Sequence, residues 1–227
     1  MALPLKILYE DNHLLVVDKP ALVATMGALP GKPTLVEMAK KYIAEKYNKP
    51  GKVYLGVVSR LDAFVTGVIV FARTSKAADR LNQQFQKRTT KKTYWAIVPD
   101  RLVRSEGQLN DWVLKDDDAR LMRVVPPETQ SSKQALLEYQ TIGQNSNDDT
   151  VLVSIQLQTG RKHQIRVQFS NLKCPIIGDR KYGSPHPFQS GIALHSRFLT
   201  LEHPTKRNEL TFESPVPKEW NLSQFVM

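Results

Sequence analysis

The chain has 227 residues, which is long enough to bury a substantial hydrophobic core. Hydrophobic residues make up 41% of it and charged residues 24%, a composition of folded globular proteins that excludes a largely disordered chain. Lysine and arginine number 32 against 22 acidic residues, so the formal net charge is +10, which favours a polyanionic partner such as nucleic acid.

The first half of the chain predicts paired strands and two capped helices. Short apolar segments predict strands at residues 7–10, 14–18, 53–57 and 68–73. Thr34 is placed to cap a helix whose apolar face is Leu35, Met38, Ala39, Tyr42 and Ile43. Ser75 is placed to cap a second helix, which buries Ala77, Ala78, Leu81 and Phe85.

The second half is richer in strands. Alternating apolar and polar residues predict strands at residues 93–98, 108–114, 121–125, 135–142 and 151–158, with a hairpin turn at Asn147, Asp148 and Asp149. A third helix is predicted at residues 163–172, with Ile165, Phe169 and Leu172 on one face, and strands follow at 193–201 and 209–212. Many strands with few helices predict an α+β fold with a mixed, largely antiparallel sheet. No repeat or long linker divides the chain, so we expect a single domain over residues 1–227.

Other features bear on compartment and cofactors. The single cysteine, Cys174, excludes a disulfide within the chain and agrees with a reducing compartment. The first eleven residues lack the apolar stretch of a signal peptide, and no apolar run is long enough to span a membrane, so we expect a cytoplasmic protein without a membrane partner. No histidine has partners at metal-binding spacing, and residues 27–34 depart from a phosphate-binding loop and are interpreted as a turn. We therefore expect no metal and no cofactor.

Three stretches combine polar residues in a suggestive context. They are S-R-L-D-A-F-V-T-G at residues 59–67, K-T-Y-W-A-I-V at 92–98, and L-Q-T-G-R-K-H-Q-I-R at 157–166, which continues to P-I-I-G-D-R-K-Y-G at 175–183. Singly, each has an ordinary explanation: a loop aspartate forms turns, a strand tyrosine packs, and an arginine near a helix start is solvated.

Together these stretches resemble the RluA-like family of pseudouridine synthases. The family's R-L-D motif with its S/T-G ending matches Arg60, Leu61, Asp62, Thr66 and Gly67, and its K-x-Y-x-A-x-V strand matches residues 92–98. The T-G-R-x-H-Q-I-R segment is matched at every fixed position at residues 159–166, and P-I-x-G-D-x-x-Y-G at 175–183. The opening hairpin at residues 10–20 and the closing strands are also similar, so the resemblance covers essentially the whole chain.

The chain departs from the family's pattern at several positions. Ser59 stands where the family usually has histidine, Ala63-Phe64-Val65 replaces a polar loop with an acid, and Lys173 replaces a glycine. These changes bear on local hydrogen bonding and on the target sequence. The opening hairpin begins almost at residue 1, so we expect no separate N-terminal RNA-binding domain.

The resemblance implies a pseudouridine-synthase-like sheet with a few flanking helices and a central RNA-binding cleft. It implies an isomerase that converts specific uridines to pseudouridine in structured ribosomal or transfer RNA without a cofactor, and that acts as a monomer. Asp62 is the implied carboxylate, Tyr94 the residue that stacks on the target base, and Arg166 the cation beside Asp62. The strand alternation then assigns Trp95 to the core.

Six further residues are implied to bind RNA or to support the site. Arg60 is expected to enter the gap left by a flipped nucleotide, and Thr66 and Gly67 to shape the loop. Arg161, His163 and Gln164 lie at the start of the third helix, where a purely structural role for His163 and Gln164 is equally open.

The mechanism and some alternatives remain open at this point. The carboxylate can stabilise positive charge on the sugar, attack the anomeric carbon, or take the neighbouring sugar proton. The alternatives to a synthase are a non-catalytic RNA-binding protein on the same fold, a hydrolase that releases uracil, and a merely basic globular protein.

Overall fold

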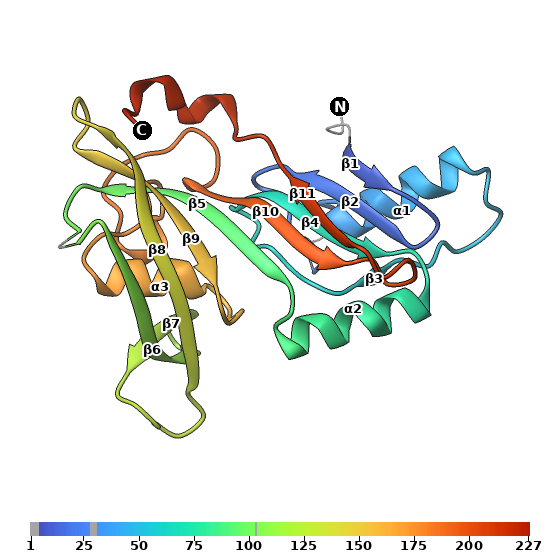
Figure 1. The fold of residues 1–227 in the computed structure, drawn as a ribbon, viewed down its shortest axis with the longest axis horizontal. Helices are drawn as coiled ribbons and strands as arrows, with labels where there is room; N and C mark the ends of the chain where they lie inside the picture. The colour runs from blue at the N-terminus through green and yellow to red at the C-terminus, as the bar shows by residue number, and fades with distance from the viewer. Residues whose placement is uncertain (1–4, 28–30, 103) are drawn as a thin grey trace. The chain divides into compact units, whose positions relative to one another are not determined.

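The computed structural model describes residues 5–27, 31–102 and 104–227, and the chain forms two compact units. The first unit comprises residues up to 91 and 196–215, and the second comprises residues 92–195 and 216–227. Figure 1 labels the helices and strands of the chain. The turn predicted at residues 27–34 falls partly on residues 28–30, which lie outside the described residues.

The first unit combines strands with two helices. Its elements are β1 (Lys6–Glu10), β2 (Leu14–Lys19), α1 (Leu35–Lys46), β3 (Gly56–Val57), β4 (Thr66–Ala72), α2 (Ser75–Lys87), the part of β10 (Leu194–Glu202) from residue 196 onward, and β11 (Glu209–Glu213). The strand order is β1-β2-β4-β10, with β11 beside β10 and β3 beside β4. Strand β2 pairs antiparallel with β4, so that Lys19 lies opposite Gly67.

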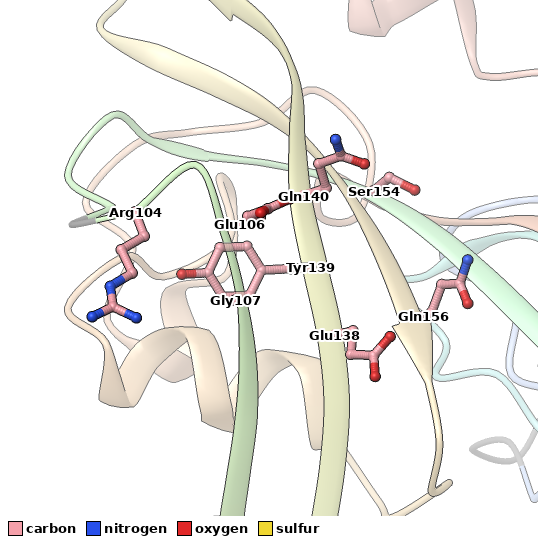
Figure 2. A pocket seen from close by; sticks show the side chains of 8 residues that line it. All are labelled: Arg104, Glu106, Gly107, Glu138, Tyr139, Gln140, Ser154 and Gln156. Carbon is pink, nitrogen blue, oxygen red and sulfur yellow. The ribbon is translucent and has the colours of Figure 1, made fainter.

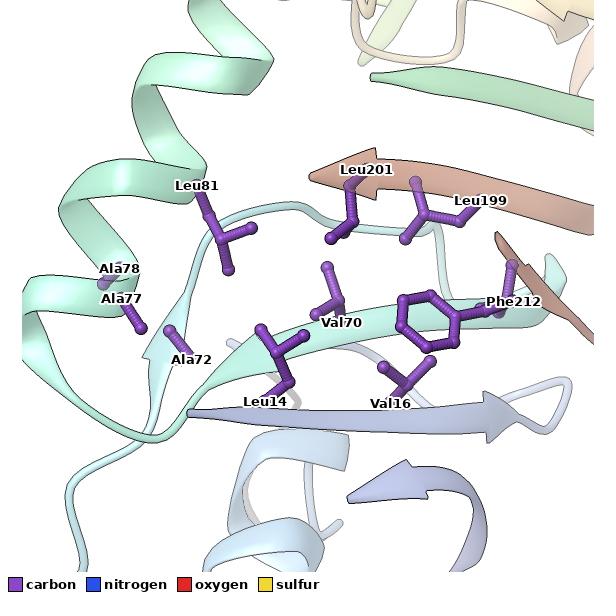
Figure 3. Close-up of a cluster of buried hydrophobic side chains, with 11 residues drawn as sticks. Leu14, Val16, Val70, Ala72, Ala77, Ala78, Leu81, Leu199, Leu201 and Phe212 are labelled. Carbon is purple, nitrogen blue, oxygen red and sulfur yellow. The ribbon is translucent and has the colours of Figure 1, made fainter. Parts of the chain in front are cut away.

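The apolar strands of this unit are covered on both faces. One cluster joins β2, β4, β10 and β11 to α2 through Leu14, Val70, Leu81, Leu199 and Phe212, among others (Figure 3). A second cluster joins the alternate residues of β2 and β4 to α1, and it includes Leu15, Val17, Leu35, Ile43 and Phe71. Strands buried on both faces read as continuous apolar runs, which explains the sequences L-L-V-V and G-V-I-V-F-A.

The helix caps confirm one prediction and correct another. Thr34 caps α1 in a capping box, in which its side chain and that of Glu37 each accept a hydrogen bond from the other residue's amide. Helix α2 is capped by Thr74, whose hydroxyl accepts a hydrogen bond from the Ala77 amide at 3.1 Å, so the prediction of Ser75 was wrong by one residue. Thr74 keeps an extended backbone, while Ser75 is already helical and cannot receive that amide. The strand predicted at residues 53–57 is limited to β3.

The second unit is an antiparallel sheet with one α-helix. Its elements are β5 (Lys91–Pro99, from residue 92 onward), β6 (Glu106–Asp116), β7 (Leu121–Val125), β8 (Lys133–Asn145), β9 (Thr150–Leu157), α3 (Gln164–Asn171) and short 3₁₀ turns at Arg180–Tyr182, Lys218–Trp220 and Leu222–Gln224. The strand order is β5-β9-β8-β6-β7, and each of these pairs is antiparallel. The predicted turn between β8 and β9 is confirmed at residues 146–149.

Helix α3 packs on one face of this sheet. The ring of Phe169 meets that of Tyr139 on β8 edge-on, with centroids 5.7 Å apart, and Val167 packs with Val113 and Ala135. Leu172, predicted to face inward, is 36% exposed because the helix ends at Asn171 and Leu172 is its C-cap. The α+β class and the largely antiparallel sheet are confirmed. Among the described residues, no helix is long and apolar enough to cross a membrane.

Candidate active site

Asp62 opens a tight turn at the head of β4. Its carbonyl accepts a hydrogen bond from the Val65 amide at 3.1 Å, which leaves Ala63 and Phe64 as the two central residues of the turn. Aspartate is favoured at the first position of such turns. The Asp62 side chain is half-buried, whereas Arg60 and Phe64, two residues away on either side, are exposed.

The turn is tied to the segment that follows β2. The Thr25 hydroxyl donates to the Leu61 carbonyl at 2.8 Å and lies 3.1 Å from the Leu61 amide, so both polar groups of the residue before Asp62 are bound. Thr25 is itself buried. These contacts fix the backbone on the N-terminal side of the carboxylate.

Lys19 fixes the other side. Its side chain has no exposed surface, and its Nζ donates to the carbonyl oxygens of Pro20 and Val23, each at 2.8 Å, and of Ala63 at 3.0 Å. Burial lowers the pKa of Lys19 to about 7, and the negative charge of Asp62 raises it in opposition. Lys19 is therefore both a brace for the Asp62 turn and a cation in the electrostatic field of Asp62.

Thr66 and Gly67 begin β4 directly after the turn, and both are buried. Gly67 has a φ of +112°, and a Cβ built there would lie 2.3 Å from the Ser196 carbonyl oxygen of β10. Only glycine allows both this conformation and this close approach. This agrees with the predicted loop-shaping role of Gly67.

In the second unit, Arg166 projects from α3 into a buried ion pair. Its Nε and one terminal nitrogen donate to the two carboxylate oxygens of Asp179 at 2.7 and 2.8 Å, and the two side chains are 3% and 1% exposed. Its guanidinium also lies 4.9 Å from the ring centroid of Tyr182. The two-point contact fixes the orientation of the guanidinium plane.

Tyr182 also orients His163, the residue before α3. The Tyr182 hydroxyl oxygen accepts a hydrogen bond from the Met122 amide at 2.9 Å. It also lies 2.8 Å from Nδ1 of His163. The hydroxyl can either donate to Nδ1 or accept from it, according to the tautomer of His163. His163 adopts a left-handed backbone with a φ of 52°.

Gln164 and Arg161 join the start of α3 to β8. The Gln164 amide group donates to the Leu136 carbonyl at 3.1 Å, and its oxygen accepts from the Thr159 hydroxyl at 2.8 Å and the Arg161 amide at 3.0 Å. The Arg161 Nε donates to the Gln134 carbonyl at 2.9 Å. These contacts give Gln164 a structural role, which is one of the two roles that the sequence left open for it.

Tyr94 and Trp95 occupy opposite faces of β5. Tyr94 pairs with Ile155, which pairs with Tyr139, so Tyr94 shares the face against which α3 packs. Trp95 pairs with Ser154 on the other face and is only half-buried, so its assignment to the core was wrong. Alternation predicted the separation correctly, but Trp95 lies between the buried pair of Ile97 and Leu152 and the more exposed pair of Thr93 and Gln156 on its face.

A pocket of about 490 Å³ lies over β6, β8 and β9 (Figure 2). By strand alternation, five of its lining side chains point away from the face that α3 covers: Glu106, Glu138, Gln140, Ser154 and Gln156. The pocket contains none of the predicted site residues. Its two carboxylates make it a poor place for a polyanion.

The predicted site residues are thus divided between the units. Asp62, Arg60, Thr66 and Gly67 belong to the first unit, and the second unit carries Tyr94, Arg161, His163, Gln164 and Arg166. The pairing of Asp62 with Arg166 stays a prediction. In the described part of the chain, no group of three His, Cys, Asp or Glu residues is arranged to hold a metal ion.

Sequence reasoning gave no role to Lys19, Thr25, Asp179 or Tyr182. Lys19 carried a usable signal, because a lysine that closes an apolar strand must bury its stem and find partners for its charge. Asp179 and Tyr182 lay inside a matched motif, but their partners are 13 and 19 residues away along the chain. Thr25 carried no such signal.

Comparisons with known proteins identify the family. A family model described as RNA pseudouridylate synthase matches residues 13–171. The uncharacterized RNA pseudouridine synthase YhcT of Bacillus subtilis is 35% identical over 217 residues, which cover 95% of this chain and 70% of that protein. The dual-specificity RNA pseudouridine synthase RluA of Escherichia coli is 36% identical over 214 residues, or 93% of either chain.

A solved structure extends the match to three dimensions. The human RNA pseudouridylate synthase domain containing 4 superposes with a TM-score of 0.80 at 26% identity, and covers 98% of this chain and 94% of that chain. The range matched by the family model includes Asp62, Tyr94 and Arg166. The chain belongs to the RluA-like family of RNA pseudouridine synthases.

Proposed function

We propose that this chain isomerises specific uridines in structured RNA to pseudouridine, and that Asp62 is its catalytic carboxylate. The observation that carries the assignment is the bracing of the Asp62 turn. Lys19 and Thr25 bind the backbone at Ala63 and Leu61, on either side of the aspartate. A surface aspartate without a function needs no such support, whereas a catalytic carboxylate must be held in one position.

The reaction needs few other chemical groups from the protein. The glycosidic carbon–nitrogen bond of uridine breaks, the base rotates, carbon 5 bonds to the sugar, and the hydrogen on carbon 5 leaves as a proton. The change is an isomerisation in which nothing is oxidised and no group is imported. A carboxylate beside the anomeric carbon can stabilise the developing positive charge, form a bond to the sugar, or take the adjacent sugar proton.

Tyr94 and Arg166 are proposed to act on the same uridine as Asp62. The target base must leave its stack, which costs a few kcal/mol, and an aromatic ring can recover about 1–3 kcal/mol of this. Tyr94 is half-buried on β5 and offers such a ring. Arg166, held by Asp179, offers a fixed positive charge for a carboxylate or a phosphate.

The substrate class follows from the charge and the family. The net charge of +10 and the exposed cations Arg60, Lys87, Arg88 and Lys91 of the first unit favour an RNA backbone. We propose a stem-loop of ribosomal or transfer RNA as the target, because splayed loop bases are accessible to a protein. We further propose that both units form one catalytic domain and that the protein acts as a monomer in the cytoplasm. Light scattering of the purified protein tests the monomeric state.

Nucleoside analysis tests the proposed reaction against its alternatives. Unmodified transcripts of large-subunit ribosomal RNA and a pool of transfer RNA transcripts are incubated with the protein, digested to nucleosides and separated. We expect pseudouridine to appear and uridine to fall by the same amount. Free uracil would instead indicate a hydrolase, and RNA that is bound but unchanged would indicate a non-catalytic binding protein.

A further inference from the structure

Two large apolar side chains are exposed on the turn of the proposed catalytic carboxylate and on the segment that is hydrogen-bonded to it. Phe64, two residues after Asp62, is 46% exposed, and Leu22, in the segment after β2, is 61% exposed. Single apolar residues on a surface are common and need no explanation. Here the two side chains come from segments that the fold joins, so they are considered together and are called the apolar platform.

Lys19 joins the two segments of the apolar platform. Its ammonium group donates both to the Val23 carbonyl, next to Leu22, and to the Ala63 carbonyl, next to Phe64. The Thr25 hydroxyl adds a second link, to Leu61. The exposed side chains are therefore carried by backbone that is fixed on both sides, and little conformational entropy is lost when they bind a partner.

The backbone at Leu22 gives a second, independent reason to look for a partner. Leu22 has a φ of 64°, a left-handed conformation that glycine adopts freely and that costs a leucine free energy. Its side chain gains little from burial in the fold, because most of it is exposed. Residues held in strained backbone conformations cluster at active sites and ligand-binding sites.

The occupant is indicated by what surrounds the platform. Arg60 is exposed on the other side of Asp62, and the chain as a whole carries a net charge of +10. A polyanion with exposed flat apolar faces fits this combination, and an unstacked stretch of RNA is such a molecule. On the basis of the proposed function, we propose that the apolar platform stacks against an unpaired base that neighbours the target uridine.

This contact determines how tightly and in which loop context the RNA is held, and it leaves the chemical step to Asp62. Phe64 is accordingly a binding residue whose loss raises KM and the dissociation constant of the RNA while kcat stays within a few-fold. Stacking on an aromatic ring corresponds to roughly a 5- to 100-fold change in affinity. Tyrosine and tryptophan preserve the stacking face, whereas leucine preserves only the apolar character.

The test compares the variants Phe64→Ala, Phe64→Leu and Phe64→Trp with the native protein. The substrate is the transcript, made with 5-tritiated uridine, from which the native protein releases tritium fastest. We expect Phe64→Ala and Phe64→Leu to raise KM and the filter-binding dissociation constant roughly 5- to 100-fold, and Phe64→Trp to stay near the native values. Tyr54→Ala is the matched control, because Tyr54 is also exposed, at 51%, but lies near the far end of β4 beside β3. Unchanged melting temperatures exclude misfolding.

Leu22→Gly separates binding from folding. Glycine relieves the left-handed strain, so this variant should be as stable as the native protein or more stable, and should still bind the transcript several-fold more weakly. Native affinity in both Leu22→Gly and Phe64→Ala, or full recovery by Phe64→Leu, overturns the stacking proposal. If the native protein releases no tritium from any transcript, the proposed function fails, and filter binding of the same transcripts still tests the platform.

Discussion

Lys19 is a charged residue with no exposed surface, and its proton links stability to pH. Its pKa is lowered to about 7 by burial, while an unfolded lysine has a pKa of about 10.4. Below pH 7 both states hold the proton, so this residue causes no pH dependence there. Between pH 7 and 10.4 the unfolded state binds the proton more strongly, so the free energy of unfolding contributed by Lys19 rises with pH.

We therefore predict that replacing Lys19 by methionine removes a rise in stability of about 2–3 kcal/mol between pH 7.5 and 9.5. Urea unfolding of the native protein and of Lys19→Met at both pH values measures this difference. Lys6→Met is the control, because the Lys6 side chain is 55% exposed and its variant should keep the native rise. An identical rise in Lys19→Met would show that Lys19 does not titrate in this range.

The buried pair of Arg166 and Asp179 leads to a second prediction at this scale. Removing one partner of a buried pair leaves an uncompensated charge, which typically costs about 3–5 kcal/mol. Asp179→Asn should lower the free energy of unfolding by about that amount and should also lower activity, since the guanidinium loses its fixed orientation. Urea unfolding and tritium release measure the two effects, with Asp149→Asn in the exposed β8–β9 turn as control. A loss no larger than that of the control contradicts the structural role of this pair.

At the residue scale, motifs predicted candidates but not their supports. The matched stretches contained Asp62, Tyr94 and Arg166, whose roles stay predictions. The brace on Asp62 comes from Lys19 and Thr25, which lie 43 and 37 residues earlier in the chain. Hydrogen bonds between such distant residues depend on the tertiary fold, and no local pattern encodes them.

At the scale of secondary-structure elements, the contact of β4 with β10 depends on one glycine. A Cβ on Gly67 would lie 2.3 Å from a carbonyl oxygen of β10, and the φ of +112° strains any other residue. We predict that Gly67→Ala lowers the free energy of unfolding by about 3 kcal/mol or more.

Gly51→Ala isolates the effect of the close contact. Gly51 has a φ of +90°, but nothing lies within 4 Å of a Cβ built there, so this variant should lose only about 1 kcal/mol. Thermal or urea unfolding of both variants gives the comparison. Equal losses would mean that the backbone conformation, and not the approach of β10, makes glycine necessary.

Sequence patterns predicted the elements of the fold well where burial has a simple period. The helices α1 and α2 and the strands β2 and β4 lie where apolar residues repeat, because each helix packs on one of two hydrophobic clusters to which both strands contribute. The errors lie at ends and edges: Thr74 replaces Ser75 as a cap, Leu172 is exposed, and Trp95 is only half-buried. Alternation separates the two faces of a strand, but it does not state which face another element covers.

For the whole molecule, composition and charge predicted the class of partner. A net charge of +10 on a globular chain favours a polyanion such as RNA over a cationic or neutral ligand, and the RluA-like family acts on RNA. Charge cannot specify which RNA is modified, because the phosphate backbone is the same in all of them. That information resides in base contacts, for which the apolar platform and Tyr94 are the proposed sites.

Tritium release tests the central claim, that Asp62 performs the isomerisation. Forming the new carbon–carbon bond expels the hydrogen on carbon 5, so transcripts with 5-tritiated uridine report the reaction without knowledge of the target position. We predict release by the native protein and by Asp79→Asn, an exposed carboxylate on α2, and at least a 1,000-fold loss in Asp62→Asn with RNA binding retained, on the order expected for a catalytic group. Equal release by Asp62→Asn and the native protein would contradict the assignment of Asp62.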